Sequence, residues 1–172
     1  MKKSVRDPVL AIHQKFAEAI YDGRKDWEFR LVPPPVDDVV FIYETRPVCA
    51  VTGGIHFAYK IEGGPAWVWA VVKALRLFHS AEHNKPGISK KQFDEYTEGK
   101  EKVAALRVLA ALRFDKPITL LGTPPQNWYY ISREKSFRPA DGYGYTLAYP
   151  RPEPLTPEEE LADTIARQKE VM

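Results

Sequence analysis

The sequence of 172 residues contains a single cysteine, Cys49. One cysteine cannot form an internal disulfide, and there is no second thiol with which to build a zinc site. A disulfide-stapled scaffold and a cysteine-based metal module are therefore excluded. We expect Cys49 to be a small hydrophobic residue buried in a strand.

Long apolar runs are also missing, because no window approaches the roughly 18 consecutive apolar residues of a membrane span. The chain starts with the basic segment 1–4, but Arg6, Asp7 and Pro8 follow before any apolar signal-peptide core can form. We therefore expect a cytoplasmic protein that does not associate with membranes.

Neither sign of charge dominates, since 25 basic residues stand against 23 acidic ones and the net charge is +2. This balance gives no overall basic field of the kind that drives non-specific phosphate binding. Acidic residues gather between Glu153 and Glu160, which leaves the chain ahead of them more basic than the total. Any nucleic-acid-binding surface is therefore expected to be local.

The length favours one domain with additional segments, and 44% hydrophobic with 28% charged residues is typical of a globular protein. Periodicity and turn residues predict helices over 13–21, 65–79 and 89–97, and strands over 25–31, 39–45 and 48–61. The glycine pair 53–54 leaves open whether the last segment is one strand or two. Ser89 and Gln92 have the spacing of a capping box at the start of the third helix.

Residues 102–114 fit two patterns. Their alanines and leucines favour a helix, but alternate positions also form a continuous apolar face of period two, as in a strand. Near the end of the sequence, the segment 156–159 has the cap, proline and glutamate of a helix start. An amphipathic helix over 156–171 follows.

Several segments appear in a characteristic order: VLAI at 9–12, a helix ending at Gly23, Lys25 with EFR at 28–30, VFIYETRPV at 40–48, and the segments 88–99 and 117–126. In this order they resemble the ASCH domain family of the PUA-like superfamily, up to about Ile131. The resemblance favours a strand over a helix for residues 102–114. It implies an α+β fold in which helices surround a twisted, mostly antiparallel β-barrel over residues 1–131. Residues 132–172 would then be an extension with a loop and a C-terminal helix.

The resemblance also implies functions, because members of the family are mostly inferred nucleic-acid binders and some resemble ribonucleases. A related branch looks like amidohydrolases that act on acetylated cytidine through a lysine, a threonine and a glutamate. Lys25 matches that lysine, but Glu28 stands where that branch has threonine. The intact deacetylase triad is therefore not carried over.

Glu28 and Arg30 lie on the polar face of the strand that starts after Lys25, while Trp27 and Phe29 face the core. An arginine can hold a phosphate with two parallel hydrogen bonds, a lysine adds a point charge, and a carboxylate can accept from a base amino group. A solvated Glu28–Arg30 pair contributing about 0.2–1 kcal/mol is the alternative.

Further candidate ligand-binding residues lie at the end of the second strand and around the later loop: Tyr43, Thr45, Arg46, Gln126 and Tyr130. Arg46 is expected to bind phosphate, and Tyr130 could stack on a base. The alternative is an ordinary strand end and aromatic core residues. His79 and His83 have the spacing of two metal ligands on a helix, but no third ligand is evident, so neither a metal nor a cofactor is predicted.

These residues predict a domain that binds RNA, DNA or a nucleotide-like small molecule. In the first alternative the protein is a hydrolase of an N-acylated pyrimidine nucleoside or a ribonuclease, with Lys25 as base or stabiliser and Glu28 as acid/base partner. In the second it is an interaction module that docks on a protein partner through residues 156–171.

Overall fold

The computed structural model describes residues 6–37, 39–78, 85–120, 122–132 and 145–148. The elements in chain order are β1 (Arg6–Ile12), α1 (Gln14–Tyr21), β2 (Trp27–Arg30), β3 (Val40–Glu44), β4 (Ala50–Gly63), α2 (Pro65–Phe78), α3 (Lys90–Thr97), β5 (Val103–Ile118), β6 (Trp128–Ser132) and β7 (Tyr145–Ala148). Among these residues no helix is long and apolar enough to cross a membrane.

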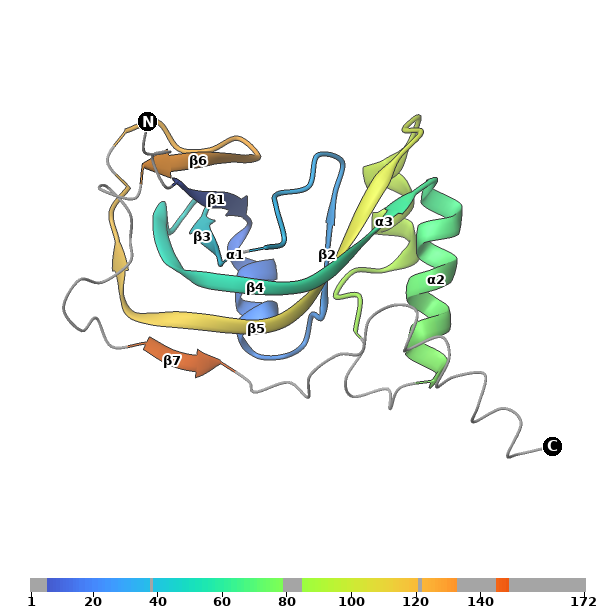
Figure 1. Cartoon of the computed structure of the whole chain (residues 1–172), viewed down its shortest axis with the longest axis horizontal. Coiled ribbons are helices and arrows are strands. Elements are labelled where there is room, and N and C mark those ends of the chain that lie inside the picture. Colours follow the sequence, from blue (N-terminus) through green and yellow to red (C-terminus); the bar gives the residue numbers. More distant parts are fainter. Residues whose placement is uncertain (1–5, 38, 79–84, 121, 133–144, 149–172) are drawn as a thin grey trace.

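All the described strands belong to one mixed sheet, in the order β2-β5-β4-β3-β1-β6, with β7 paired to β5 (Figure 1). The neighbouring strands are antiparallel except β1 and β3, which are parallel. The predicted α+β class is therefore confirmed. The expectation of a closed barrel is corrected, because β2 and β6 end the sheet and do not pair with each other among the described residues.

The sheet does not close at β2 for a local reason. This strand has only four residues, and three prolines at 33–35 follow it and cannot donate ladder hydrogen bonds. Its free edge is instead tied to β1 by a side chain, since the Arg30 guanidinium donates to the Ala11 carbonyl at 2.7 Å. A side-chain contact therefore spans the open seam, which is the side of β2 that has no strand partner among the described residues.

The sheet is built around two long, curved strands, β4 and β5, which pair from Val51↔Ile118 to Gly63↔Val103. The glycine pair 53–54 thus lies within one strand, close to two shifts in its pairing register. Gly53 is required at a close approach, because a Cβ there would come within 2.0 Å of the Leu112 carbonyl oxygen. The ambiguous residues 102–114 form most of β5, so the strand interpretation is confirmed.

The described core has three parts. The first lies between α1 and the middle of the sheet, the second lies where α2 and α3 pack near β2 (Figure 1), and the third includes Val9, Phe41 and Tyr43. In the second part, Phe29 of β2 contacts Phe93 of α3, with ring centroids 5.0 Å apart. Trp27 and Phe29 are buried, as their alternation predicts. These contacts place α3 beside the strand that carries Glu28 and Arg30.

Two further expectations have clear outcomes. The capping box of Ser89 and Gln92 is present at the start of α3. Cys49, by contrast, is exposed and has a φ of 52°, because it lies in the turn between β3 and β4 and not in a strand. His79, His83 and the helix expected over 156–171 lie outside the described residues; of the expected extension, β7 joins the sheet beside β5.

Candidate functional site

A cleft of about 510 Å³ opens where the ends of β1 and β3 meet β2, α3 and the loop before β6. Its lining includes the five candidate residues Lys25, Glu28, Arg30, Thr45 and Gln126. The sequence places these residues in three separate segments, and the sheet order brings the segments together. The structure therefore joins most of the predicted site into one concave surface.

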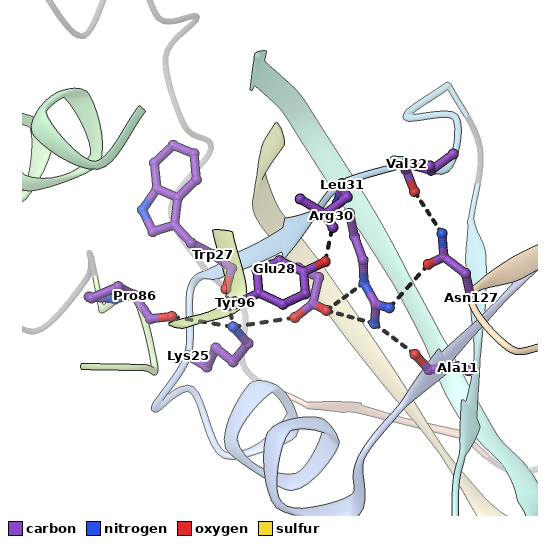
Figure 2. A network of polar contacts seen from close by, with 10 residues as sticks. All are labelled: Ala11, Lys25, Trp27, Glu28, Arg30, Leu31, Val32, Pro86, Tyr96 and Asn127. Carbon is purple, nitrogen blue, oxygen red and sulfur yellow. Dashed lines mark hydrogen bonds and ion pairs between the residues drawn. The ribbon is translucent and has the colours of Figure 1, made fainter. Parts of the chain in front are cut away.

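Glu28 is the centre of a charged network at the cleft (Figure 2). One carboxylate oxygen lies 3.3 Å from the Lys25 ammonium, and the other lies 2.8 Å from the Arg30 guanidinium. The Glu28 side chain is only 7% exposed. A solvated surface pair is therefore wrong for these residues, which form a buried triad of two cations and one anion.

Lys25 is held on several sides. Its ammonium donates to the Trp27 carbonyl at 2.5 Å and to the Pro86 carbonyl at 3.3 Å, besides its contact with Glu28. The Phe16 and Phe29 rings lie 5.5 and 5.4 Å away, close enough for cation–π attraction. The ammonium thus has an acceptor for each of its three protons.

Residues 85–88, here called the strap, cover Lys25 from a part of the chain about sixty residues away. Asp26 fastens the strap, since its amide donates to the Lys85 carbonyl at 2.6 Å and its carboxylate accepts from the Lys85 amide at 2.7 Å. Gly87 of the strap lies directly against the Lys25 stem. This covering explains why a residue at the end of a surface turn is only 2% exposed.

Arg30 connects the network to the open seam of the sheet. It donates to the Asn127 side-chain oxygen at 3.2 Å as well as to the Ala11 carbonyl. The Asn127 amide in turn donates to the Val32 carbonyl at 3.2 Å (Figure 2). Asn127 therefore joins the loop before β6 to the end of β2, and it fixes the guanidinium beside Glu28.

The network shifts the pKa values of its members. Burial lowers the pKa of the Lys25 amine, against the opposing effect of Glu28. Burial alone would raise the pKa of Glu28, but the charges of Lys25 and Arg30 outweigh it and hold that pKa below its usual range. Glu28 is thus a carboxylate at neutral pH. Buried groups with shifted pKa values at a cleft are typical of functional sites.

The cleft also contains residues that were not among the predicted site residues. His13, the residue before α1, places its Nδ1 3.0 Å from the Thr45 hydroxyl oxygen. Gln92, Glu95 and Tyr96 line the cleft from α3. Their spacing of three and four residues in the sequence could have indicated that they share one face of a short helix.

Three candidate residues do not line the cleft. Tyr43 is 5% exposed and packs in the core with Phe41, because both faces of β3 are buried. Arg46 follows Thr45 directly and is exposed. Tyr130 is 46% exposed on β6, where its ring packs edge-on against Trp128. Among the described residues, no group of three His, Cys, Asp or Glu side chains could hold a metal ion.

The open sheet, its three helices and the charged cleft define an α+β domain with a site of the size of a small ligand. The chain belongs to the ASCH domain family, whose family model matches residues 10–117. It is 27% identical over 140 residues to an ASCH domain-containing ribonuclease of Zymomonas mobilis, an alignment covering 76% of this chain and 88% of that protein.

Solved structures of ASCH proteins are also similar to this chain. A variant of ZmASCH from Zymomonas mobilis is similar with a TM-score of 0.61 and 26% identity, covering 77% of this chain and 92% of that one. The ASCH structure from the same organism has a TM-score of 0.59 at 26% identity, covering 75% and 90%. The arrangement of sheet and helices is therefore that of known ASCH structures.

Proposed function

We propose that the chain binds single-stranded RNA and takes one nucleotide into the cleft above Lys25, Glu28 and Arg30. The observation that carries this proposal is the combination of a cavity of about 510 Å³ with a buried charged floor. A cavity of this volume suits a small ligand or one nucleotide and not a duplex. Single-stranded RNA can place an unstacked base into such a cavity, whereas a duplex keeps its bases stacked.

The charged floor favours an electronegative ligand. Within the triad, Lys25 and Arg30 carry two positive charges against the single negative charge of Glu28, so the poorly solvated floor has one positive charge, while Glu95 adds a carboxylate to the lining from α3. The ammonium and the carboxylate already have close partners within the network. We therefore propose that the network acts on the ligand through its fixed positive field, and not through direct binding of phosphate by Lys25 and of a base edge by Glu28. Preorganised charge of this kind attracts phosphate or carbonyl oxygens without side-chain rearrangement.

Phosphates outside the cleft require cations at its rim. Arg46 is exposed next to Thr45, which lines the cleft. Lys15 is exposed as well, and its ammonium lies 4.7 Å from the ring of the cleft residue Phe16. We assign the phosphates that flank the inserted nucleotide to these two side chains. This local patch supplies the positive charge that the balanced composition lacks.

RNA cleavage is a second candidate function. The relative in Zymomonas mobilis is named a ribonuclease, and His13 supplies a proton-transfer group at the cleft, with Thr45 orienting its ring. A histidine at this place could accept the proton of a ribose 2′-hydroxyl as the 2′-oxygen bonds to the adjacent phosphorus and forms a 2′,3′-cyclic phosphate. The bond between phosphorus and the 5′-oxygen breaks in the same step, and the 5′-oxygen leaves as a hydroxyl after it takes a proton from water. The positive floor would then stabilise the charge that develops on the phosphate.

Anisotropy titration with labelled pentanucleotides of RNA and DNA, followed by gel analysis of the same mixtures, tests both candidates. The double variant Thr45→Val/Gln126→Ala removes two polar cleft groups outside the charged network, and we expect it to weaken RNA binding about tenfold. Thr119→Val, an exposed threonine that does not line the cleft, is the matched control.

Each result has a distinct meaning. Binding of intact RNA supports the binding function, and shortened RNA adds the cleavage function. Deacylation of N4-acetylcytidine by the same preparation would assign the chain to the amidohydrolase alternative. An absence of binding to any oligonucleotide, with a native circular dichroism spectrum, would refute the proposal.

A further inference from the structure

The wall of the cleft that α3 provides has a chemical pattern of its own. Gln92, Glu95 and Tyr96 are spaced by three and four residues, which places them on one helix face, and all three line the cleft. The helix is held firmly, because the capping box fixes its first turn and Phe93 is completely buried in the core. These three side chains therefore project from a rigid element.

Tyr96 provides a flat surface at the cleft. It is 41% exposed, and its hydroxyl oxygen accepts a hydrogen bond from the Leu31 amide at 3.2 Å (Figure 2). The ring is thus attached at its far end to the segment after β2, while its body remains accessible. A tyrosine fixed in this way can stack on a nucleobase without losing much side-chain entropy.

Gln92 and Glu95 offer complementary hydrogen-bonding groups one helical turn apart. The Gln92 side-chain oxygen accepts from the Ser89 amide at 2.9 Å in the capping box, so its amide nitrogen remains as a donor. Among the described residues the ion pair of Glu95 is with Lys91, at 3.9 Å, and both side chains are largely exposed. The wall therefore presents a donor and, next to it, a carboxylate with two acceptor oxygens.

We infer that the α3 wall selects guanine for the nucleotide that enters the cleft. Guanine carries two parallel donors, N1–H and the N2 amino group, beside the acceptor O6. Glu95 would accept both donors in a bidentate contact, Gln92 would donate to O6, and Tyr96 would stack on the ring. This inference rests on the proposed binding of a nucleotide in the cleft.

The other bases do not match this pattern. Adenine and cytosine each place a ring nitrogen acceptor beside their amino group, so the carboxylate would meet one donor and one repelling lone pair. Uracil has one N–H between two carbonyl oxygens. Inosine keeps N1–H and O6 but lacks the N2 amino group, and it therefore isolates one of the two contacts with Glu95.

The test is a set of four labelled RNA pentanucleotides with uridine at the outer positions and guanosine, inosine, adenosine or uridine at the centre. We expect the guanosine oligonucleotide to bind at least tenfold more tightly than the adenosine and uridine ones, with inosine between them. In the Glu95→Gln variant, the difference between guanosine and inosine should largely disappear. Glu98→Gln is the control, because Glu98 follows α3 and does not line the cleft.

The outcomes separate this inference from the proposal on which it rests. A guanosine preference that Glu95→Gln removes and Glu98→Gln leaves intact supports the guanine-selecting wall. Tight binding of all four oligonucleotides with similar affinity, or a preference that survives Glu95→Gln, overturns the wall and leaves RNA binding standing. Failure of all four to bind overturns RNA binding itself and guanine selection with it.

Discussion

The Cα atom of Gly87 lies against the aliphatic stem of Lys25, so closely that a Cβ on Gly87 would come within 2.3 Å of Lys25 Cγ. The same glycine has a φ of +74°, in the left-handed region that side chains disfavour. The close contact and the positive φ thus each require glycine at position 87 of the strap. The contact also means that the position of the Lys25 ammonium depends on a segment far away in the sequence.

The first prediction concerns this contact. Gly87→Ala should lower the free energy of unfolding by about 3 kcal/mol, because backbone strain at positive φ adds to overpacking against Lys25. Urea denaturation followed by tryptophan fluorescence measures the change. Affinity for RNA should fall as well, since the displaced strap no longer supports the Pro86 carbonyl that Lys25 contacts.

Gly99 is the matched control for Gly87. It has a similar φ of +66°, but no atom lies within 4 Å of the Cβ that a substitution would add. Gly99→Ala should therefore cost only the backbone strain, about 1 kcal/mol. Equal losses in the two variants would show that the contact between Gly87 and Lys25 has no energetic weight.

The second prediction follows from the lowered pKa of Glu28. A carboxyl group whose pKa is lower in the folded than in the unfolded state binds fewer protons when folded, so its contribution to stability is present above the unfolded pKa. It is lost as pH falls through the folded pKa, which for Glu28 lies below the usual value of 4.5. The stability advantage of wild type over Glu28→Gln should therefore be largest near neutral pH and shrink below about pH 4.5.

Urea denaturation of both proteins between pH 2.5 and pH 7 measures this difference. Other carboxyl groups titrate equally in the two proteins, so they cancel in the comparison. A wild-type advantage that stays constant over the whole range would contradict the ion pairs of Glu28 with Lys25 and Arg30.

Much of the framework could be predicted from local patterns. The alternation of apolar residues around Trp27 and Phe29 predicts β2 correctly, and the Ser89–Gln92 spacing predicts the start of α3. These signals succeed because they depend on neighbours within a few residues. Grouping Lys25, Glu28 and Arg30 near one another also followed from their positions on a single short segment.

The burial of that segment could not be predicted in the same way. A polar residue on alternate positions of a strand normally indicates a solvent-facing side, yet Glu28 is covered and paired with Lys25. The covering strap comes from residues 85–88, and α3 with its cleft residues comes directly after it. Contacts over such sequence distances leave no periodic pattern in the sequence. The exposed position of Cys49 was missed for another reason, because it depends on a turn geometry that the residue type does not specify.

The third prediction concerns the open seam of the sheet. Asn127→Ala removes the acceptor for Arg30 and the donor to the Val32 carbonyl, so it should destabilise the fold by about 2 kcal/mol. Its neighbour Gln126 is exposed, and its side chain forms no hydrogen bond within the described part of the chain. Gln126→Ala should therefore change stability by less than about 0.5 kcal/mol.

Thermal and urea unfolding measure the stability of the two variants, and RNA titration measures their affinity. We expect Asn127→Ala to affect stability first, and Gln126→Ala to affect affinity while stability stays near wild type. If Gln126→Ala proves the more destabilising of the two, then Asn127 does not hold the seam between β2 and the loop before β6.

The last prediction concerns the phosphate contacts at the rim. If Lys15 and Arg46 each neutralise one phosphate of single-stranded RNA, the double variant Lys15→Gln/Arg46→Gln should flatten the plot of log affinity against log salt concentration by about 1.4. The double variant Lys102→Gln/Lys116→Gln removes the same charge from residues that do not line the cleft. Anisotropy titrations at four salt concentrations measure both slopes. A loss of slope only in the first variant assigns the phosphates to the rim, because a general effect of net charge would flatten both plots equally.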